Sequence, residues 1–321
     1  MHVLALFKVF QEFNVVSINL ENDWHGVFAP SKTVPNSEEF CLFLQKLIQN
    51  PRSLDGLEVL KYSETVRVYK AKCQTGDTCF EVVCKQSLRR GGWKEWVSRW
   101  RGPREWRNFF RGLALLRAGI LTARPIAFVE CRKGVQQAWL VTEYVSGLAD
   151  LERVASDFLP RLPADRRTAT RMLIIQEVVQ LFRKLDESGF HHRDLKASNI
   201  LVRSVDGSDG PPQVFLVDLD GLSRRRLFRR AAWRQRIVRL TASLEGHPGV
   251  TRTDRWRFIR AVVGKCRMAK QECRMSNQEW RMASDEDRRR VKELYRKIAI
   301  DAATYAKRSQ FRKTNKLESG G

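Results

Sequence analysis

Three side chains in the second half of the chain have the types and spacing needed to handle a phosphate group. Asp194 lies in a polar stretch, where its carboxylate can accept a proton from an attacking hydroxyl. Asn199 follows five residues later, and Asp218 follows an apolar run at residues 214–217. Because amide and carboxylate oxygens suit Mg²⁺, Asn199 and Asp218 are candidate ligands of a magnesium ion that holds phosphates. This pattern predicts phosphoryl transfer to a hydroxyl.

A lysine and a glutamate in the first half could complete such a site. The alternation at 66–71, a turn at 74–77 and the β-branched run at 78–84 predict a hairpin that delivers Lys85 at the end of its second strand. Glu105 lies 20 residues later, on a helix predicted over 104–118. A Lys85–Glu105 ion pair would orient the ammonium toward the inner phosphates of a nucleotide.

The order of these features resembles that of protein kinases. His192-Arg193-Asp194 with Asn199 fits the catalytic-loop pattern H-R-D-x-x-x-x-N. The resemblance places a hinge at 142–145, where the backbone groups of Glu143 and Val145 would bind adenine. It also places Lys196 near the transferred phosphoryl group, although a solvated loop lysine is an equal alternative. The nucleotide implied is ATP, with Mg²⁺ as its cofactor.

Two departures from the kinase pattern bear on the substrate. No G-x-G-x-x-G precedes Lys85, and the equivalent turn contains Ser63 and Thr65, whose hydroxyls could cap a phosphate. Asp218-Leu219-Asp220-Gly221 replaces D-F-G, and no A-P-E follows. A peptide would lack its docking platform, so a small or glycan substrate is favoured. For Asp220 we favour a helix cap over a second metal ligand.

The remaining elements predict an α+β, two-lobed, protein-kinase-like fold with a small β-rich N-lobe and a helical C-lobe. Strands are expected over 125–131 and 138–144. The predicted divisions are an extension of unknown role at 1–57, an N-lobe at 58–145, a C-lobe at 146–305 and a disordered tail at 306–321. Two amphipathic helices are expected over 37–50 and 166–188, with buried faces containing Phe40, Leu42, Phe43, Leu47 and Ile48 in the first and Met172, Ile175, Val179, Phe182 and Leu185 in the second.

Composition sets the wider limits. The chain has 321 residues, of which 43% are hydrophobic, and this excludes wholesale disorder. Its net charge of +23 lies mainly in residues 86–118 and 221–321, and predicts anionic partners. Seven cysteines without a C-x-x-C pair favour reduced thiols over a disulfide framework or a zinc site. With no apolar run long enough to span a bilayer and no secretion signal, a cytoplasmic, membrane-adherent protein is expected.

Residues 58–265 resemble the lipopolysaccharide-core kinases, the Kdo/heptose kinase family of Gram-negative bacteria. The resemblance lies in Lys85, the Arg104-Glu105-Trp106-Arg107 stretch, and Gly119-Ile120-Leu121-Thr122 before Pro125. It continues through HHRDLKASNIL, LVDLDGL and the stretch at 251–258. The family implies a kinase-like fold and transfer of the ATP γ-phosphate to a sugar hydroxyl of the lipid A–core precursor, at the cytoplasmic face of the inner membrane. Lys85, Glu105, Asp194, Asn199 and Asp218 match the family's positions.

Two other functions remain open from sequence. One is a bacterial Ser/Thr/Tyr protein kinase, against which the missing A-P-E counts. The other is an inactive kinase-like module that binds anionic lipid or RNA, against which the intact site residues count. The acceptor sugar and the oligomeric state are not determined by the sequence.

Two basic segments have competing interpretations. Trp93, Trp96 and Trp100 share one helical face among arginines and lysines, which suits core packing, an anionic membrane surface or, third, nucleic-acid stacking. The run at 224–239 holds eight arginines in sixteen residues. Two interpretations of this run have equal weight: a solvated helix face, and a surface that contacts phosphate or membrane.

Overall fold

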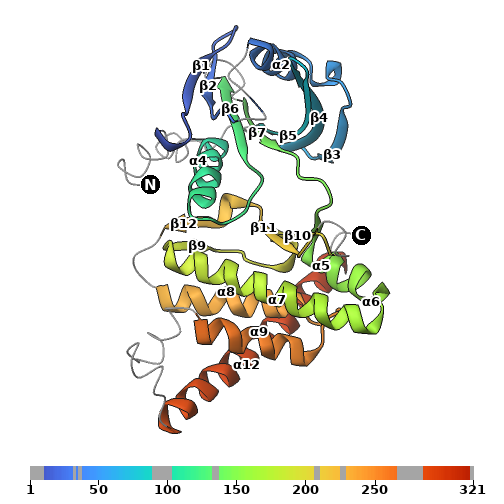
Figure 1. The fold of residues 1–321 in the computed structure, drawn as a ribbon, viewed down its shortest axis with the longest axis vertical. Helices are drawn as coiled ribbons and strands as arrows, with labels where there is room; N and C mark the ends of the chain where they lie inside the picture. Colours follow the sequence, from blue (N-terminus) through green and yellow to red (C-terminus); the bar gives the residue numbers. More distant parts are fainter. Residues whose placement is uncertain are drawn as a thin grey trace. The chain divides into compact units, whose positions relative to one another are not determined.

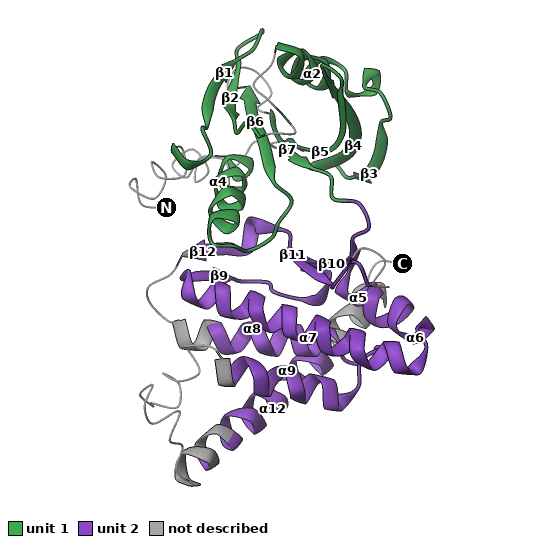
Figure 2. Ribbon diagram, viewed as in Figure 1, with its two compact units in different colours: residues 1–145 green, residues 146–321 purple. Residues whose placement is uncertain are grey.

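The computed structural model describes residues 11–31, 34, 38–88, 103–131, 137–205, 210–224, 229–265 and 285–318. The chain divides into two compact units, residues 1–145 and residues 146–321 (Figure 2). The stripe of Trp93, Trp96 and Trp100 lies outside the described residues.

Unit 1 contains a seven-stranded antiparallel sheet in the order β1-β2-β6-β7-β5-β4-β3 (Figure 1). Its strands are β1 (Val16–Asn19), β2 (Trp24–Phe28), β3 (Glu58–Tyr62), β4 (Val66–Thr75), β5 (Thr78–Leu88), β6 (Pro125–Cys131) and β7 (Gln137–Glu143). The β4–β5 hairpin confirms the prediction. Lys85 lies within β5 and not at its end, because pairing with β4 and β7 continues to Ser87 and Leu88.

The segment before residue 58 belongs to the same sheet. The β1–β2 hairpin pairs with β6, and α2 (Glu38–Gln49) packs on the sheet through Phe40, Phe43, Leu44 and Leu47. The predicted helix is therefore present. Leu42, assigned from sequence to its apolar face, is 56% exposed, because the buried stripe follows residues 40, 43, 44 and 47.

The two faces of this sheet have different partners. One face, with Tyr69, Val82, Cys84 and Trp139, forms a core with α2. The opposite face contains the paired row Lys85–Leu140–Phe128, since directly paired residues share a face. There Trp106 of α4 (Arg104–Arg117) lies against Phe128, with ring centroids 5.5 Å apart. Lys85 therefore shares its sheet face with α4.

Unit 2 is mainly helical (Figure 1). Its short helical segments are α5 (Leu151–Arg153), η2 (Val154–Phe158), α6 (Leu159–Arg161), η3 (Ala197–Asn199) and η4 (Leu219–Gly221). The long ones are α7 (Ala164–Glu187), α8 (Arg229–Ser243), α9 (Arg252–Lys265) and α12 (Asp285–Glu318). Two small sheets complete it, with orders β11-β10-β8 and β12-β9, formed by β8 (Ala149–Asp150), β9 (Phe190–His192), β10 (Ile200–Arg203), β11 (Gln213–Leu216) and β12 (Leu222–Arg224).

Three sequence-based expectations differ from the structure of unit 2. In α7 the buried stripe includes Ile174 and Val178, whereas Met172 and Ile175 are only half-buried. Asp220 lies in η4 and is followed by the strand β12, so its expected role as a helix cap is wrong. Residues 306–318 continue α12, where the sequence suggests a disordered tail; the buried Ala302 and Ala306 anchor the helix as it enters this stretch.

The predicted α+β fold class is confirmed, with strands concentrated in the first unit and helices in the second. Among the described residues, no helix is both long and apolar enough to cross a membrane. Over the same ranges, no three or more His, Cys, Asp or Glu side chains gather in a way that could hold a metal ion.

Candidate functional site

The loop between β9 and β10 is held by hydrogen bonds from its own side chains. Asn199 donates its Nδ2 hydrogen to the carbonyl of Asp194 at 2.7 Å, so the loop closes on itself across five residues. This bond uses the amino group of the amide and directs Asn199 inward, where it is 6% exposed. The Oδ1 atom is consequently the part of Asn199 that suits a cation.

Asp218 is brought beside this loop by two contacts. The N–H of Val217 donates to the carbonyl of Asn199 at 3.0 Å, and the His192 Nε2 lies 2.9 Å from the carbonyl of Asp218. Asp218 adopts a left-handed backbone, with φ 55° and ψ 60°, which turns the chain directly after β11. The backbone at Asn199 and that at Asp218 are therefore close together, and both side chains carry oxygen atoms of the kind Mg²⁺ prefers.

His192 is fully buried beneath this arrangement. Burial lowers the pKa of its imidazole below the usual 6.5, and this outweighs the opposite effect of the bond to Asp218 and of the Asp218 and Asp194 charges. A neutral imidazole has one N–H, and a backbone carbonyl accepts, so Nε2 is assigned as the donor toward Asp218. His192 thus links the two motifs as a structural hydrogen-bond donor.

Gly221 permits the close approach of the two motifs. Its carbonyl accepts from the N–H of Arg193 at 2.9 Å. A Cβ at position 221 would lie 3.1 Å from the His192 ring and 3.4 Å from the backbone nitrogens of Arg193 and Asp194. A side chain here would therefore be tightly packed and would require a small shift of the His192 ring, although the φ of Gly221 is not in the left-handed region.

The carboxylate of Asp194 lies between two cations. Lys196 Nζ is 3.6 Å from Oδ2, and Arg239 Nη1 is 3.5 Å from Oδ1. The Asp194 side chain is 46% exposed, so it is open to solvent as well as held. Lys196 therefore lies beside the candidate catalytic carboxylate, as expected if it acts near the transferred group.

Three side chains of α8 contact the same segment, and sequence reasoning missed them. Arg236 donates to the carbonyl of Phe190 at 3.3 Å, Arg239 donates to the carbonyl of Arg193, and the Ser243 hydroxyl accepts from the N–H of Ala197 at 2.9 Å. They stand at i, i+3 and i+7, which is one face of a helix. This spacing could have indicated a helix face that contacts another segment, but the many other arginines of the run make it hard to recognise in the sequence.

In unit 1, Glu105 of α4 and Lys85 of β5 lie on the same side of the sheet. The Ser87 hydroxyl donates to the carboxylate of Glu105, which is 2% exposed. Ser87 lies two residues after Lys85 in a regularly paired stretch of β5, so the two side chains project from the same face. The Lys85–Glu105 ion pair itself stays a prediction, but α4 and β5 place both residues on one side of the sheet.

The turn before β4 is closed by its serine. Ser63 donates through its hydroxyl to the carbonyl of Val66 at 2.8 Å and accepts from the N–H of Val66 at 3.1 Å. The carbonyl of Thr65 accepts from the N–H of Leu88 at 3.0 Å, while Thr65 is exposed. The Ser63 hydroxyl is therefore engaged within the turn, which leaves Thr65 as the simpler candidate for a phosphate contact.

The predicted hinge, residues 142–145, begins in the last two residues of β7 and continues beyond the strand. The N–H of Glu143 donates to the carbonyl of Arg124 at 2.9 Å, and the N–H of Tyr144 donates to the carbonyl of Glu81 at 3.0 Å. Burial raises the pKa of the Glu143 carboxyl, and Arg124 acts in the opposite direction. Because the N–H of Glu143 is taken, an adenine contact here would use its carbonyl and the backbone of Val145.

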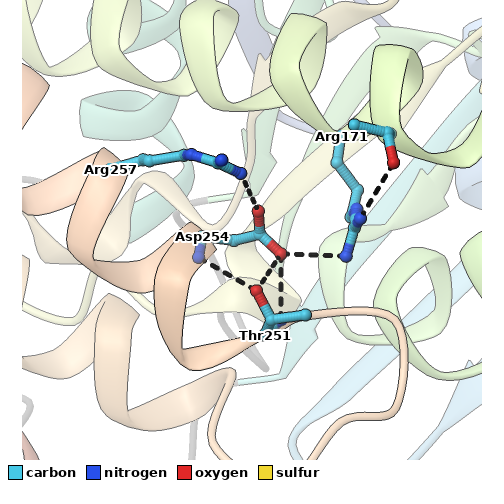
Figure 3. A network of polar contacts seen from close by, with 5 residues as sticks. Arg171, Thr251, Asp254 and Arg257 are labelled. Atoms are coloured by element: carbon cyan, nitrogen blue, oxygen red, sulfur yellow. Dashed lines mark hydrogen bonds and ion pairs between the residues drawn. The ribbon is translucent and has the colours of Figure 1, made fainter.

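The stretch at 251–258 forms the start of α9 and a buried ionic network (Figure 3). Asp254 accepts from the N–H and hydroxyl of Thr251 at 3.0 and 2.6 Å, and it pairs with Arg171 at 3.0 Å and Arg257 at 3.2 Å. Burial alone would raise the pKa of Asp254, but the Thr251 bonds and the two arginines hold it below its usual value. The network ties α9 to α7.

The structure thus assembles the predicted residues in two groups. Unit 2 brings together Asp194, Lys196, Asn199 and Asp218, and unit 1 holds Lys85, Glu105, Ser63, Thr65, Glu143 and Val145. A search of curated proteins finds no match. One solved structure, described as “WaaP in complex with acyl carrier protein”, is 20% identical to this chain with a TM-score of 0.47, covering 78% of this chain and 96% of the other.

A sequence model of the lipopolysaccharide kinase (Kdo/WaaP) family matches residues 71–261, more than half of the chain. The matched range includes Lys85, Glu105, the 192–199 loop and Asp218. It also confirms the predicted kinase-like fold. The chain therefore belongs to the lipopolysaccharide kinase (Kdo/WaaP) family and is a kinase, a phosphotransferase with an alcohol group as acceptor.

Proposed function

We propose that this kinase transfers the γ-phosphate of ATP to a sugar hydroxyl of the lipopolysaccharide core, on a Kdo or a heptose residue, with Mg²⁺ as cofactor. The observation that carries the proposal is the loop in unit 2, where Asn199 and Asp218 offer oxygen ligands beside the accessible carboxylate of Asp194. Magnesium bound there would neutralise phosphate charge during transfer.

In the proposed step, the acceptor hydroxyl oxygen forms a bond to the γ-phosphorus. The bond from the γ-phosphorus to the bridging oxygen breaks, and ADP leaves with its electron pair. Asp194 orients the hydroxyl and accepts its proton, while Lys196 stabilises the transferred phosphoryl group. Asp194 is suited to this role because its carboxylate is reachable from solvent yet held by two cations.

The nucleotide contacts are proposed for unit 1. Lys85 binds the inner phosphates and Glu105 orients it, which is supported by their shared sheet face and the Ser87–Glu105 bond. Thr65, with Ser63 shaping the turn, lies near the phosphates, and the backbone of Glu143 and Val145 receives adenine. Lys85, Glu105, Glu143 and Val145 lie within the range that matches the family, whereas Ser63 and Thr65 precede it.

We further propose that the protein works at the cytoplasmic face of the inner membrane as a peripheral protein. A lipid-linked acceptor requires access to that surface. The net charge of +23, concentrated in two parts of the chain, favours binding to anionic lipid headgroups.

The test uses the full chain with γ-labelled ATP and Mg²⁺. Three acceptors are compared: lipid A carrying only Kdo, lipid A–core carrying Kdo and heptose, and a mixture of Ser, Thr and Tyr peptides. Label on one of the glycolipids, lost in Asp194→Asn and on chelation of Mg²⁺, supports the proposal, and locating the new phosphate by mass spectrometry of the labelled glycan distinguishes Kdo from heptose. Label on peptides alone, or ATP turnover unaffected by Asp194→Asn, contradicts it.

A further inference from the structure

Helix α8 follows the Asp218 motif and contacts the catalytic loop at three successive points. From Arg236 through Arg239 to Ser243, its contacts move from Phe190 to Arg193 and then to Ala197. One face of the helix is therefore matched along its length to the segment that carries Asp194. Two of the three contacts reach only backbone atoms.

Arg239 differs from the other two because it also touches the candidate catalytic side chain. Its Nη1 donates to the carbonyl of Arg193 and lies 3.5 Å from Oδ1 of Asp194. The other carboxylate oxygen, Oδ2, lies 3.6 Å from Lys196. A guanidinium fixed on one oxygen restricts rotation of the carboxylate and keeps the other oxygen on the Lys196 side.

The Arg239 guanidinium is itself held in place. The side chain is 20% exposed, and its Cζ lies 5.8 Å from the centroid of the Tyr305 ring in α12. Packing against the ring and the loop backbone limits the rotamers of the arginine before any substrate binds. A surface arginine that served only as a solvated charge would not need these contacts.

We propose that Arg239 is a positioning residue for phosphoryl transfer, holding the Asp194 carboxylate and the Arg193 carbonyl in the orientation that directs the acceptor hydroxyl. The inference rests on the proposed function, in which Asp194 contacts that hydroxyl. Arg239 acts through Asp194, so its loss slows the chemical step without weakening the binding of either substrate. Small displacements of a positioning group are expected to be costly, since an error near 1 Å can reduce a rate about 100-fold.

The experiment is a double-mutant cycle of Arg239→Gln and Asp194→Asn, assayed with whichever glycolipid the wild type labels. Arg239→Gln is expected to lower kcat by about 10- to 100-fold, with the KM values for ATP and acceptor changed less than about 3-fold. In the Asp194→Asn background the same change should have little further effect, because the carboxylate that Arg239 positions has been removed. Arg239→Lys, which retains a cation but not the planar fork, should recover part of kcat.

Arg234→Gln is the matched control. Arg234 lies on the same helix and pairs at 3.5 Å with Asp301 of α12, a residue outside the loop. It should leave kcat within about 2-fold of wild type. Thermal unfolding and ATP binding check that each variant is folded. If Arg239→Gln does not fold, Arg239→Lys carries the same test, in which reduced kcat with unchanged KM values supports the proposal.

The outcomes separate the two proposals. If Asp194→Asn retains wild-type turnover, the proposed function is contradicted. If Asp194→Asn is slow but the Arg239 variants keep wild-type kcat, only the role of Arg239 is overturned. Equal fold losses from Arg239→Gln in both backgrounds, or a loss seen entirely in KM, would also overturn it.

Discussion

The two groups of candidate residues are held by different physical means. In unit 1, Lys85 is one position in a ladder of backbone hydrogen bonds, paired with Val68 on one side and Leu140 on the other. In unit 2, the loop of Asp194 is held by side chains: His192, Asn199, Arg239 and Ser243 all bond to backbone atoms. Substitution of a candidate residue in the first group should therefore change activity with little change in stability. Substitution of a residue that holds the loop in the second group should change both.

The largest effect is expected from Lys85→Met. The β5 ladder does not need this side chain, so the loss in unfolding free energy should come only from its contacts with neighbouring side chains and stay within about 1–2 kcal/mol. Loss of a preorganised cation at the phosphates should lower kcat/KM by about 100- to 1,000-fold. Steady-state kinetics and denaturant unfolding measure the two quantities. Lys72→Met, an exposed lysine on β4, is the control and should be near wild type in both.

Asp254→Ala tests whether stability in unit 2 can be lost without touching the loop. It removes the carboxylate that accepts from Thr251 at the start of α9, and it leaves Arg171, 16% exposed, without its buried carboxylate. We expect a loss of about 3 kcal/mol in unfolding free energy, with kcat per folded molecule unchanged. Denaturant melts and active-site titration report the two values. A stability change below about 1 kcal/mol would show that the network in Figure 3 contributes less than its contacts suggest.

His192→Phe should reduce stability and activity together. The aromatic ring fills the buried space, but the Asp218 carbonyl loses its partner, at a cost of about 1–3 kcal/mol. Because that bond also positions Asp218, kcat should fall by about 10-fold. His247→Gln, elsewhere in unit 2, serves as the comparison. Loss of activity with an unchanged melting temperature would contradict the distinction between the two groups.

The acid limb of stability should depend on His192. Its folded-state pKa lies below the usual 6.5, so the contribution of the neutral ring is complete above 6.5 and is lost as the pH falls through the folded-state pKa. The wild-type melting temperature should consequently decline below pH 6.5. The melting temperature of His192→Phe should be lower than that of the wild type at neutral pH, but it should decline less steeply as the pH falls below 6.5. Parallel curves for the two proteins would rule out this residue as the source.

Ser63→Ala should have the smallest effect. The hydroxyl closes the turn before β4 by two bonds to Val66, so its removal should cost about 0.5–1 kcal/mol. Because the turn geometry contributes only indirectly to phosphate binding, KM for ATP should rise less than about 3-fold. An increase beyond 10-fold would assign Ser63 a direct phosphate contact. Thr65→Val, measured alongside, indicates which hydroxyl matters more.

Short-range patterns predicted the elements that carry the site. The alternation in β4 and β5 placed Lys85 on a strand, and the motif at 192–199 placed Asp194 in a loop. These predictions succeeded because local periodicity and turn chemistry determine such elements. The exposed Leu42 shows the limit of the method, since one extra apolar residue on a helix does not reveal which neighbours the sheet provides.

Long-range contacts could not be predicted in the same way. The arginine run was interpreted as a solvent or phosphate contact, yet Arg236 is 3% exposed and bonds to the Phe190 carbonyl. Which backbone carbonyl a distant helix will meet depends on tertiary packing, and charge density alone contains no such information. Likewise, nothing local in residues 24–28 indicates that they pair with β6, more than ninety residues later.

The pairing of β2 with β6 has a practical consequence for anyone who expresses a shortened protein. A clone trimmed to residues 71–261 would lack β1, β2, β3 and the first half of β4. Both edges of the remaining sheet would then be exposed, with unpaired amides and carbonyls along β6 at one side and, at the other, along the part of β5 that has lost its partner in β4. Such a fragment would be prone to aggregate during purification, so an expressed fragment should begin upstream of Val16.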